Sequence, residues 1–540
     1  MSRSDSKNLL LNRRQAILLS ASAGVGAAIG RPAAASDSIK TGVHQQETAN
    51  CSTPRSAVAN TQYGKIRGFV EGGVFTFKGI PYGQNTAGEN RWLPAKPPTP
   101  WTGEYPALVY GANSPQHLHD FTAIEQAFLM DPDDGYMSED MLKLNVFTPS
   151  LTGNRAVMVY LHGGRFEYGS SSELPAHEGA QIARHHDVVQ VSVNHRLNVL
   201  GFLDVSEIGG PAYADSANVG LTDLVAALRW VHENIANFGG DPSRVMIYGQ
   251  SGGGSKVTNL MAMPSAVGLF HRASAQSGGG THFPPADRPH LSRELARQLM
   301  LELGFGPNDI QSLQRVEWSK LTAASNAAAA KISPGTNAAD WVATVDGRVL
   351  AARSFAETAS DLSKNVPLMV GSVSEEGMRY ASNPTEAEWR ATLVAQFGEA
   401  KATALIAAMK KAHPHKSIRL LSYGVTGIAL RNSVQRIVNL KHQQRGAPVF
   451  AYYFTWQSPM LEDAGRLAHR RARLLLRQHQ ALRTGHRQHT RSAGPRPENG
   501  HRMGQLCPHR QPQPTRPPLG ACRSCPLPDH GLRQRIPHGR

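Results

Sequence analysis

A serine set between glycines, directly after a short apolar run, has the clearest chemical potential in this chain. Residues 249–253 read Gly-Gln-Ser-Gly-Gly and follow the apolar residues 245–248. An acyl-transfer serine needs its hydroxyl raised out of the backbone, and glycines two positions before and after it permit the cramped turn from strand to helix. A helix that starts after Ser251 would also point the positive end of its dipole at a developing oxyanion. The pattern therefore predicts that Ser251 is a nucleophile, although a lone motif of this kind is also typical of plain turns.

A second glycine-rich turn lies upstream, at residues 162–166, which read His-Gly-Gly-Arg-Phe directly after an apolar run. Such a turn lets backbone N–H groups approach a substrate closely. We predict that the amides of Gly164, Arg165 and Gly252 form an oxyanion hole. The alternative is a tight turn after a strand, but the order of this turn and the serine motif is the one that an α/β-hydrolase fold requires.

The elements that must position these turns form an alternating pattern of buried strands and helices, which predicts a mostly parallel central sheet with helices on both faces. Residues 222–238 have helical spacing and end at two glycines, which is typical of a helix C-cap. Residues 63–69 and 74–80, separated by Gly72-Gly73, predict an N-terminal antiparallel hairpin. The predicted buried strands are residues 144–147, 156–161, 188–193, 245–248 and 366–370.

From about residue 64 to about residue 459 the chain resembles the type-B carboxylesterases of the cholinesterase-like family. The stretches that carry this resemblance are Phe-Lys-Gly-Ile-Pro-Tyr-Gly at 77–83, Ser-Glu-Asp-Met-Leu at 138–142, Asn-Val-Gly-Leu-Thr-Asp at 218–223, Ala-Leu-Arg-Trp-Val at 227–231, Phe-Gly-Gly-Asp-Pro at 238–242 and Leu-Phe-His-Arg-Ala at 269–273. The resemblance implies an α/β-hydrolase fold and hydrolysis of a small-molecule carboxylic ester through a serine acyl-enzyme. It implies no cofactor and no metal.

Several positions depart from the family pattern. Gln250 and Gly252 stand where the family usually has glutamate and alanine, but neither side chain would perform the chemistry. Arg165 stands where a third glycine is usual; its N–H can still donate, while its guanidinium is expected to narrow the pocket or to favour an acidic substrate. The early cysteines of the family are replaced by Met141 and by Ser114, which predicts a core without disulfides.

The acid of the family follows a strand in the sequence Asp-Glu-Gly, and here residues 374–377 read Ser-Glu-Glu-Gly after a predicted strand. The resemblance therefore assigns the acid to Glu376, which would orient the catalytic imidazole and stabilise its protonated form. Taken alone, a Glu-Glu-Gly sequence is more typical of a solvated turn. Its place in the series of motifs favours the catalytic role.

The family's histidine is missing from the Gly-Ala-x-His position that should follow residues 449–456. Instead, residues 464–540 hold 16 Arg, no Lys, one Glu, one Asp and no Phe, Trp or Tyr, a composition that cannot build a core. Three interpretations compete: a basic arm for nucleic acid, a basic arm for anionic membrane, or a slipped reading frame. The codons for residues 465–474, read one nucleotide later, can spell Gly-Ala-Trp-His-Thr-Ala-Glu-Leu-Ala, the missing motif, so we favour the slipped frame.

The displaced histidine codon straddles Ala468 and His469, so His469 lies one residue from the expected base and is a weak candidate to replace it. Two rival functions follow. One is a catalytically crippled esterase, because loss of a triad member costs on the order of thousands-fold in rate. The other is a binding or adhesion module, although such relatives typically lack the nucleophile that this chain keeps.

The N-terminus predicts an export signal over residues 1–35, with Arg13-Arg14, an apolar run over residues 16–29, and Ala33 to Ala35. Twin arginines favour the Tat route over an ordinary Sec signal, which implies a periplasmic or secreted protein. A polar linker over residues 36–60 and a catalytic domain over residues 61–463 follow. The net charge of +16 lies almost wholly in the tail, which carries +14, so the body indicates no nucleic-acid partner; no later stretch is long enough to span a membrane.

Overall fold

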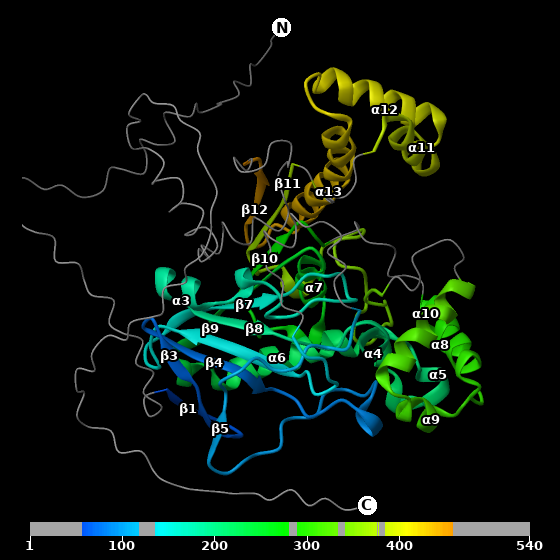
Figure 1. The fold of residues 1–540 in the computed structure, drawn as a ribbon. Coiled ribbons are helices and arrows are strands. Elements are labelled where there is room, and N and C mark those ends of the chain that lie inside the picture. The colour runs from blue at the N-terminus through cyan, green and yellow to red at the C-terminus, as the bar shows by residue number, and fades with distance from the viewer. Residues whose placement is uncertain are drawn as a thin grey trace, which may run out of the picture. The chain divides into compact units, whose positions relative to one another are not determined.

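A nine-stranded sheet forms the centre of the fold (Figure 1). The computed structural model describes residues 57–117, 135–279, 289–332, 341–374, 376 and 384–456. The strand order is β12-β11-β10-β9-β7-β8-β6-β4-β3. The strands of this sheet are β3 (Phe69–Glu71), β4 (Val74–Pro81), β6 (Lys143–Thr148), β7 (Arg155–Leu161), β8 (Val189–Val193), β9 (Gly240–Gln250), β10 (Arg272–Gln276), β11 (Leu368–Val373) and β12 (Val449–Phe454).

The six strands from β12 to β8 in this order are parallel to one another, whereas β6, β4 and β3 continue the sheet in antiparallel pairing. The prediction of a mostly parallel sheet is therefore confirmed, and each of the five predicted buried strands overlaps an observed strand. β10 was not predicted, because its sequence Arg-Ala-Ser-Ala-Gln contains no β-branched residue.

The N-terminal hairpin differs in detail from the prediction. β3 and β4 pair antiparallel across Gly72-Gly73, and both glycines have positive φ, at 54° and 78°. The first predicted strand, however, is divided: β2 (Gly64–Arg67) pairs with β1 (Val58–Thr61) and with β5 (Glu104–Pro106) in a separate three-stranded sheet. β1 begins within the stretch predicted as a polar linker.

Helices cover both faces of the central sheet, as predicted. Tyr160 and Tyr248 pack with Ile182 of α3 (Ala180–His186), whereas Val159 and Ile247 belong to the large core cluster that includes α6 (Val219–Asn234). Because successive side chains of a strand point to opposite faces, α3 and α6 lie on opposite sides of the sheet. A short 3-10 turn extends α6 as far as Phe238, and Gly239 ends it in the left-handed conformation.

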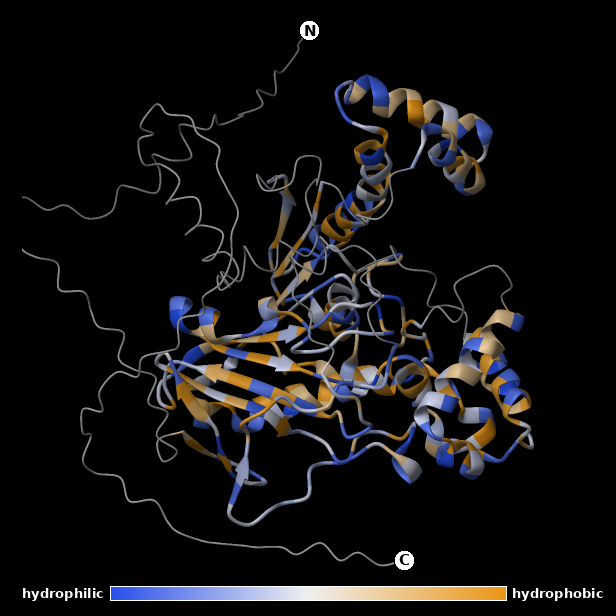
Figure 2. Cartoon of the chain, viewed as in Figure 1, coloured by the Kyte–Doolittle hydropathy of each residue, from blue (hydrophilic) through white to orange (hydrophobic). Residues whose placement is uncertain are grey.

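The remaining helices carry both apolar and polar residues, visible as orange and blue segments along their ribbons in Figure 2. α7 packs on β9 and β10, and α13 packs on β11 and β12. Trp389 and Leu393 of α11, Ile406 of α12 and Leu421 of α13 form a small separate core. These helices are α7 (Gly252–Leu260), α8 (Pro289–Leu303), α9 (Ile310–Arg315), α10 (Trp318–Ile332), α11 (Glu386–Phe397), α12 (Glu399–Ala412) and α13 (Ile418–Gln443).

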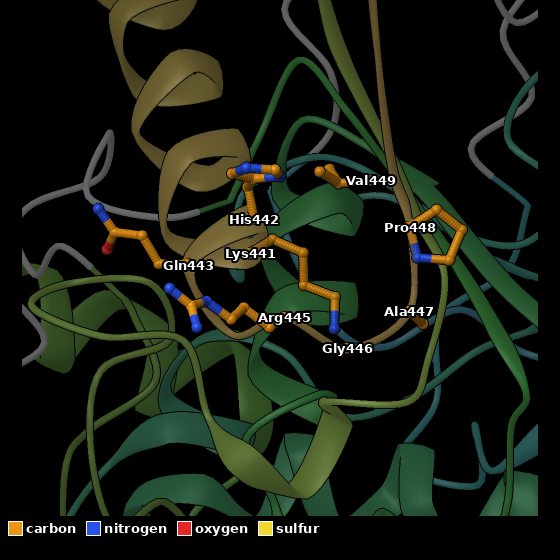
Figure 3. Close-up of a pocket in the computed structure, with 8 residues that line it drawn as sticks. All are labelled: Lys441, His442, Gln443, Arg445, Gly446, Ala447, Pro448 and Val449. Carbon is orange, nitrogen blue, oxygen red and sulfur yellow. The ribbon is translucent and has the colours of Figure 1, made fainter.

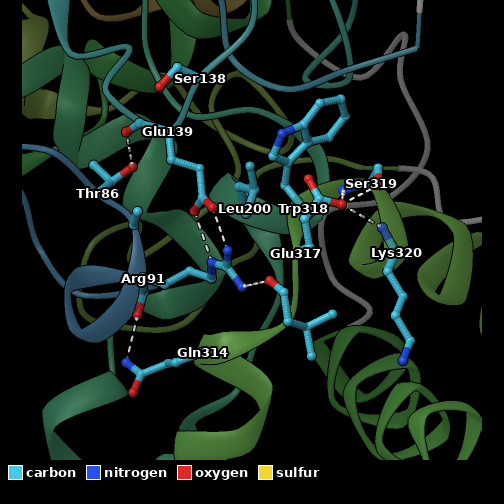
Figure 4. Close-up of polar contacts among 12 residues, drawn as sticks. Thr86, Arg91, Ser138, Glu139, Leu200, Gln314, Glu317, Trp318, Ser319 and Lys320 are labelled. Carbon is cyan, nitrogen blue, oxygen red and sulfur yellow. Dashed lines mark hydrogen bonds and ion pairs between the residues drawn. The ribbon is translucent and has the colours of Figure 1, made fainter. Parts of the chain in front are cut away.

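A buried ion pair ties three loops together beside the sheet (Figure 4). The Arg91 guanidinium pairs with the Glu139 carboxylate, and the two residues are only 3% and 8% exposed. Arg91 also donates to the carbonyl oxygen of Val316 at 2.8 Å, and Gln314 donates to the Arg91 carbonyl oxygen at 3.4 Å. Removal of either partner would leave an uncompensated buried charge. The ion pair and the hydrogen bonds of Arg91 therefore connect the segment before β6 to α9. Glu139 is one of the residues that carry the family resemblance, and its contacts here are structural.

Candidate active site

The predicted nucleophile and the predicted oxyanion loop lie at the same edge of the sheet. β7 and β9 are neighbouring parallel strands, with Leu161 opposite Gly249 in the register. The carboxyl ends of parallel strands meet at one edge, so residues 162–166 and residues 250–252 leave the sheet side by side. β8 lies on the other side of β7, so the strand order reverses here, which is where open α/β sheets place their ligands.

Ser251 occupies a sharp turn between β9 and α7. Its φ is 58° and its ψ is −122°, a conformation that non-glycine residues rarely adopt. Its N–H donates to the Gln276 carbonyl oxygen at 2.8 Å, at the end of β10, and its own carbonyl oxygen accepts from the Ser255 N–H at 3.1 Å in the first turn of α7. These bonds hold the turn at both ends. The Ser251 side chain is partly exposed, whereas Gly252 to Ser255 are buried.

Glycines around Ser251 allow β7 and the loop after it to lie against the nucleophile turn. A Cβ atom at position 249 would lie 2.5 Å from the Leu161 carbonyl oxygen, and one at position 253 would lie 2.9 Å from the His162 carbonyl oxygen. A Cβ atom at position 252 would lie 2.5 Å from Arg165 Cα, with the Arg165 carbonyl oxygen closer still. The structure therefore brings Gly252 and Arg165 into backbone contact.

The loop after β7 is built from two consecutive left-handed residues, Gly164 with φ 76° and Arg165 with φ 57°. The Gly164 carbonyl oxygen accepts from the N–H groups of Glu167 and Tyr168, at 3.2 and 3.1 Å. A Cβ atom at Gly163 would lie 3.7 Å from Ser251 Cβ, so the loop passes directly beside the nucleophile. The structure thus brings Gly164 and Arg165, two of the predicted amide donors, into the loop beside Ser251 and Gly252.

Glu376 follows β11, two strands along the same edge from β9. Its carboxylate is 2% exposed, and Oε1 accepts a hydrogen bond from the Val373 N–H at 2.8 Å. The Ser277 N–H donates to the Gly371 carbonyl oxygen at 2.7 Å, which joins the end of β10 to β11. A buried, backbone-held carboxylate agrees with an orienting role better than with the solvated turn that the local sequence alone suggested.

β12 pairs with β11 in parallel, so the chain that leaves β12 starts at the same edge. The Ser374 N–H donates to the Phe454 carbonyl oxygen at 3.1 Å, only two residues before Glu376. A histidine supplied soon after β12 would therefore start from beside the acid. His469, the tail over residues 464–540 and the predicted export signal all lie outside the described residues.

Comparison with known proteins agrees with this arrangement. The model of the carboxylesterase family matches residues 55–473, more than three quarters of the chain. The chain belongs to the carboxylesterase family. This membership places it among ester hydrolases with the α/β-hydrolase fold.

Named relatives of this carboxylesterase include the para-nitrobenzyl esterase of Bacillus subtilis, 30% identical over 74% of this chain and 78% of that protein. The phenmedipham hydrolase of Pseudarthrobacter oxydans is 39% identical, but the match covers only 49% of this chain and 50% of that protein. Among solved structures, an esterase of Clostridium hathewayi has a TM-score of 0.67 at 32% identity, covering 80% of this chain and 85% of that one. A Geobacillus stearothermophilus carboxylesterase has a TM-score of 0.64 at 30% identity, covering 78% and 84%.

Sequence reasoning missed one charged residue of this carboxylesterase beside the oxyanion loop. Lys256 on α7 is fully buried, and its Nζ donates to the His162 carbonyl oxygen at 3.0 Å. Burial lowers its pKa to about 7, and the nearby Glu173 carboxylate partly opposes this shift. A helical signal existed, because Lys256 lies three residues after Gly253 and four before Leu260, which are both buried.

Two histidines of this carboxylesterase lie next to Lys256. The rings of His162 and His195 stack with centroids 5.0 Å apart, and both residues are 1% exposed. Burial holds the pKa of each imidazole well below its usual value, and the Lys256 charge lowers both further. His162 Nδ1 lies 3.0 Å from the Gly163 carbonyl oxygen, and His195 Nδ1 lies 2.8 Å from the Arg196 carbonyl oxygen. Both rings are therefore neutral parts of the core at ordinary pH.

A cavity of about 640 Å³ lies elsewhere, between the end of α13 and the start of β12 (Figure 3). Lys441 lies on its wall and donates to the carbonyl oxygens of Ser363 and Lys364, at 2.7 and 2.9 Å. Because Val449 begins β12, this cavity is at the amino end of the strand, opposite the edge that carries Ser251. Within the described ranges, no helix is long and apolar enough to cross a membrane and no group of three or more metal-ligating side chains is found.

Proposed function

We propose that this carboxylesterase hydrolyses small-molecule carboxylic esters through a covalent serine acyl-enzyme. The observation that carries the proposal is the strained turn at Ser251, with φ 58° and ψ −122° at the end of β9, and the backbone contact of the Gly164-Arg165 loop with Gly252. This geometry supports a mechanism in which the Ser251 hydroxyl group attacks an acyl carbon and nearby backbone amides bind the acyl oxygen. The attack by the hydroxyl group and the binding of the acyl oxygen require no cofactor and no metal.

In the proposed reaction, Ser251 Oγ attacks the ester carbonyl carbon and its proton passes to a histidine. The amides of Gly164, Arg165 and Gly252 hold the negative oxygen of the tetrahedral intermediate. The histidine then protonates the departing alcohol. In the second half, the histidine takes a proton from the water that attacks the acyl carbon, and returns it to Ser251 Oγ as the bond to the acyl group breaks and the carboxylic acid leaves. Glu376 would keep the imidazole in the required tautomer and stabilise its cation. We propose that the histidine belongs to the codons after residue 464, read in the shifted frame.

A second candidate is a crippled esterase, and one observation favours it: the sequence lacks the Gly-Ala-x-His motif after β12. Such a chain would keep its fold and its oxyanion loop but lose most of its rate. A binding or adhesion role has less support, because the nucleophile turn is present and its backbone conformation is the uncommon one.

A fluorophosphonate probe and p-nitrophenyl acetate distinguish these candidates. The unaltered chain and a chain expressed from a gene with one nucleotide added or removed before codon 465 are compared, each with a Ser251→Ala control. Labelling lost in the control, with turnover on the order of thousands-fold faster in the frame-shifted chain, supports the esterase with a displaced histidine. Absence of labelling in both chains would point to a dead site or to a binding role. Sequencing of codons 460–470 tests the frame hypothesis independently.

We also propose export to the periplasm or the medium, on the basis of Arg13-Arg14 and the apolar run that follows. Replacing both arginines by lysine should retain the protein in the cytoplasm if the Tat route is used. Cell fractionation with an antibody against the chain measures the outcome. Unchanged export in the double variant would point to the Sec route, and cytoplasmic retention of the unaltered chain would refute export.

A further inference from the structure

The buried amine of Lys256 is the one charged group that links the nucleophile helix α7 to the loop after β7 among the described residues. Helix α7 carries the Ser251 turn at its start, and Lys256 lies one turn further along. The Lys256 side chain is 0% exposed, so its ammonium group has given up water. Burial of a charged lysine costs free energy, and contacts of the amine offset part of that cost.

The contact is with the backbone of the predicted oxyanion loop. Lys256 Nζ donates to the His162 carbonyl oxygen at 3.0 Å, and lies 5.8 Å from the centre of the Phe166 ring. His162 and Phe166 are the first and last residues of the loop that contains Gly164 and Arg165. The amine therefore acts on both ends of the segment whose amides must face the acyl oxygen.

The His162 carbonyl group is a sensitive place to hold this loop. It belongs to the peptide unit that leads into Gly163, and a Cβ atom on Gly163 would lie 3.7 Å from Ser251 Cβ. Glycines at 163 and 164 give the loop little conformational restraint of its own. A fixed donor at the preceding carbonyl oxygen compensates for that freedom.

We infer that Lys256 is a positioning residue that holds residues 162–166 in place through the His162 carbonyl oxygen, and that its charge makes the reactivity of Ser251 depend on pH. The inference rests on the proposed function for its second part only. A charge-assisted hydrogen bond is worth about 1.5–3 kcal/mol and a neutral one about 0.5–1.5 kcal/mol. Loss of the proton should therefore loosen the loop without releasing it.

The groups that face the amine favour this behaviour. Glu173, in the segment that follows the loop, favours the ammonium form, whereas burial lowers the pKa of the amine to about 7. His162 and His195 contribute no positive charge at neutral pH, because burial and the Lys256 charge hold their pKa values well below the usual range. Lys256 is thus the group of this cluster that titrates near neutrality.

Hydrogen–deuterium exchange of a peptide covering residues 162–168 tests the positioning role without any need for catalysis. Lys256→Met keeps a side chain of similar length but removes the donor. Exchange of this peptide should become about 10- to 100-fold faster, the loss expected for one charge-assisted bond. Lys441→Met is the matched control, because Lys441 is also buried and also donates to backbone carbonyl oxygens, but at the far edge of the sheet. Equal exchange of the peptide in both variants would overturn the inference.

The rate of fluorophosphonate labelling of Ser251 between pH 6 and pH 9 tests the role of charge. The ratio of the unaltered chain to Lys256→Met should be about 10- to 100-fold at pH 6 and fall to roughly 2- to 10-fold at pH 9, where a neutral amine donates instead. A ratio that does not change with pH would overturn the charge dependence. If Lys256→Met does not fold, exchange in the unaltered chain decides: corrected for intrinsic rates, the peptide must lose protection as pH rises through 7. If Ser251 is not labelled in the frame-shifted chain either, while exchange responds as expected, the proposed function fails and the positioning role stands.

Discussion

Replacing Gly252 with alanine is expected to displace the oxyanion loop, although alanine is the usual residue there in the family that the chain resembles. The new Cβ atom would lie 2.5 Å from Arg165 Cα, and ordinary van der Waals contact begins at 3.4 Å. The two backbones must therefore separate by roughly 1 Å, since the clashing atoms belong to main chain and cannot rotate away. Overpacking of this kind costs about 1–3 kcal/mol of stability, and a 1 Å misplacement near reacting atoms costs about 10²-fold in rate.

The same argument predicts which second change repairs the damage. Arg165 has φ 57°, a conformation that costs a non-glycine residue about 1–2 kcal/mol, and its side chain restricts how the loop can shift. Glycine at 165 removes both restrictions. Arg165→Gly/Gly252→Ala, the arrangement that the family pattern favours, should therefore recover to within about tenfold of the unaltered chain, because the loop can now move by the required distance.

Fluorophosphonate labelling of Ser251 and thermal unfolding measure both effects. Gly306→Ala serves as the control, because a Cβ atom there would meet nothing within 4 Å. Its effect should stay within about 0.5 kcal/mol. Normal labelling and stability in Gly252→Ala would refute the close approach of the two backbones. The compensation would be refuted if the labelling rate of the double variant falls by the product of the factors measured for the two single variants.

Three further predictions concern charge. Arg165→Gly should reduce the preference for a p-nitrophenyl ester whose acyl chain ends in a carboxylate over p-nitrophenyl acetate. The ratio of the two kcat/KM values should fall by no more than about fivefold, because Arg165 is exposed. An unchanged ratio would contradict a role of Arg165 in substrate choice. The free energy of unfolding should rise between pH 7 and pH 10.5, because Lys256 loses its proton at a lower pH in the folded state than in the unfolded chain. The rise is at most about 4–5 kcal/mol. Denaturant titrations at several pH values measure it, and Lys256→Met should show no such rise. In the frame-shifted chain, Glu376→Gln should lower kcat about 10⁴-fold, and a loss below about tenfold in steady-state kinetics would remove Glu376 from the orienting role.

The strands of this fold could be predicted wherever their residues suit a sheet that is covered on both faces. β7 and β8 consist largely of valine and other apolar residues, so their runs were apparent. β10 was not, because its alanines and serine are small enough for a crowded sheet centre but indicate no strand by themselves. The division of the first hairpin at Gly68 also needed the structure, since a Cβ atom there would lie 2.7 Å from the Phe77 ring, a contact distant in sequence.

The site was predictable to the extent that its chemistry depends on backbone turns. Glycines at fixed offsets from Ser251 and before Arg165 reported the two turns, and the structure places those turns in contact. Lys256 was missed because lysine is almost never fully buried, so its occurrence in an apolar helical stripe was not interpreted as a core position. The contact of its amine with the His162 carbonyl oxygen joins residues 94 positions apart and has no signature in either motif.

These features divide the site into two parts with separate structural origins. The oxyanion part is set by β7, β9 and α7, and rests on Gly252, Arg165 and Lys256, all within the described residues. In the proposed mechanism, the proton-transfer part needs Glu376 and a histidine encoded after β12. When a triad member is removed, oxyanion stabilisation and substrate binding alone still accelerate the reaction about 10³–10⁴-fold over water. Loss of the histidine through a slipped frame would therefore leave the oxyanion part functional. The unaltered chain is therefore expected to bind tetrahedral adducts and to turn over esters slowly. The oxyanion loop can thus be studied apart from proton transfer.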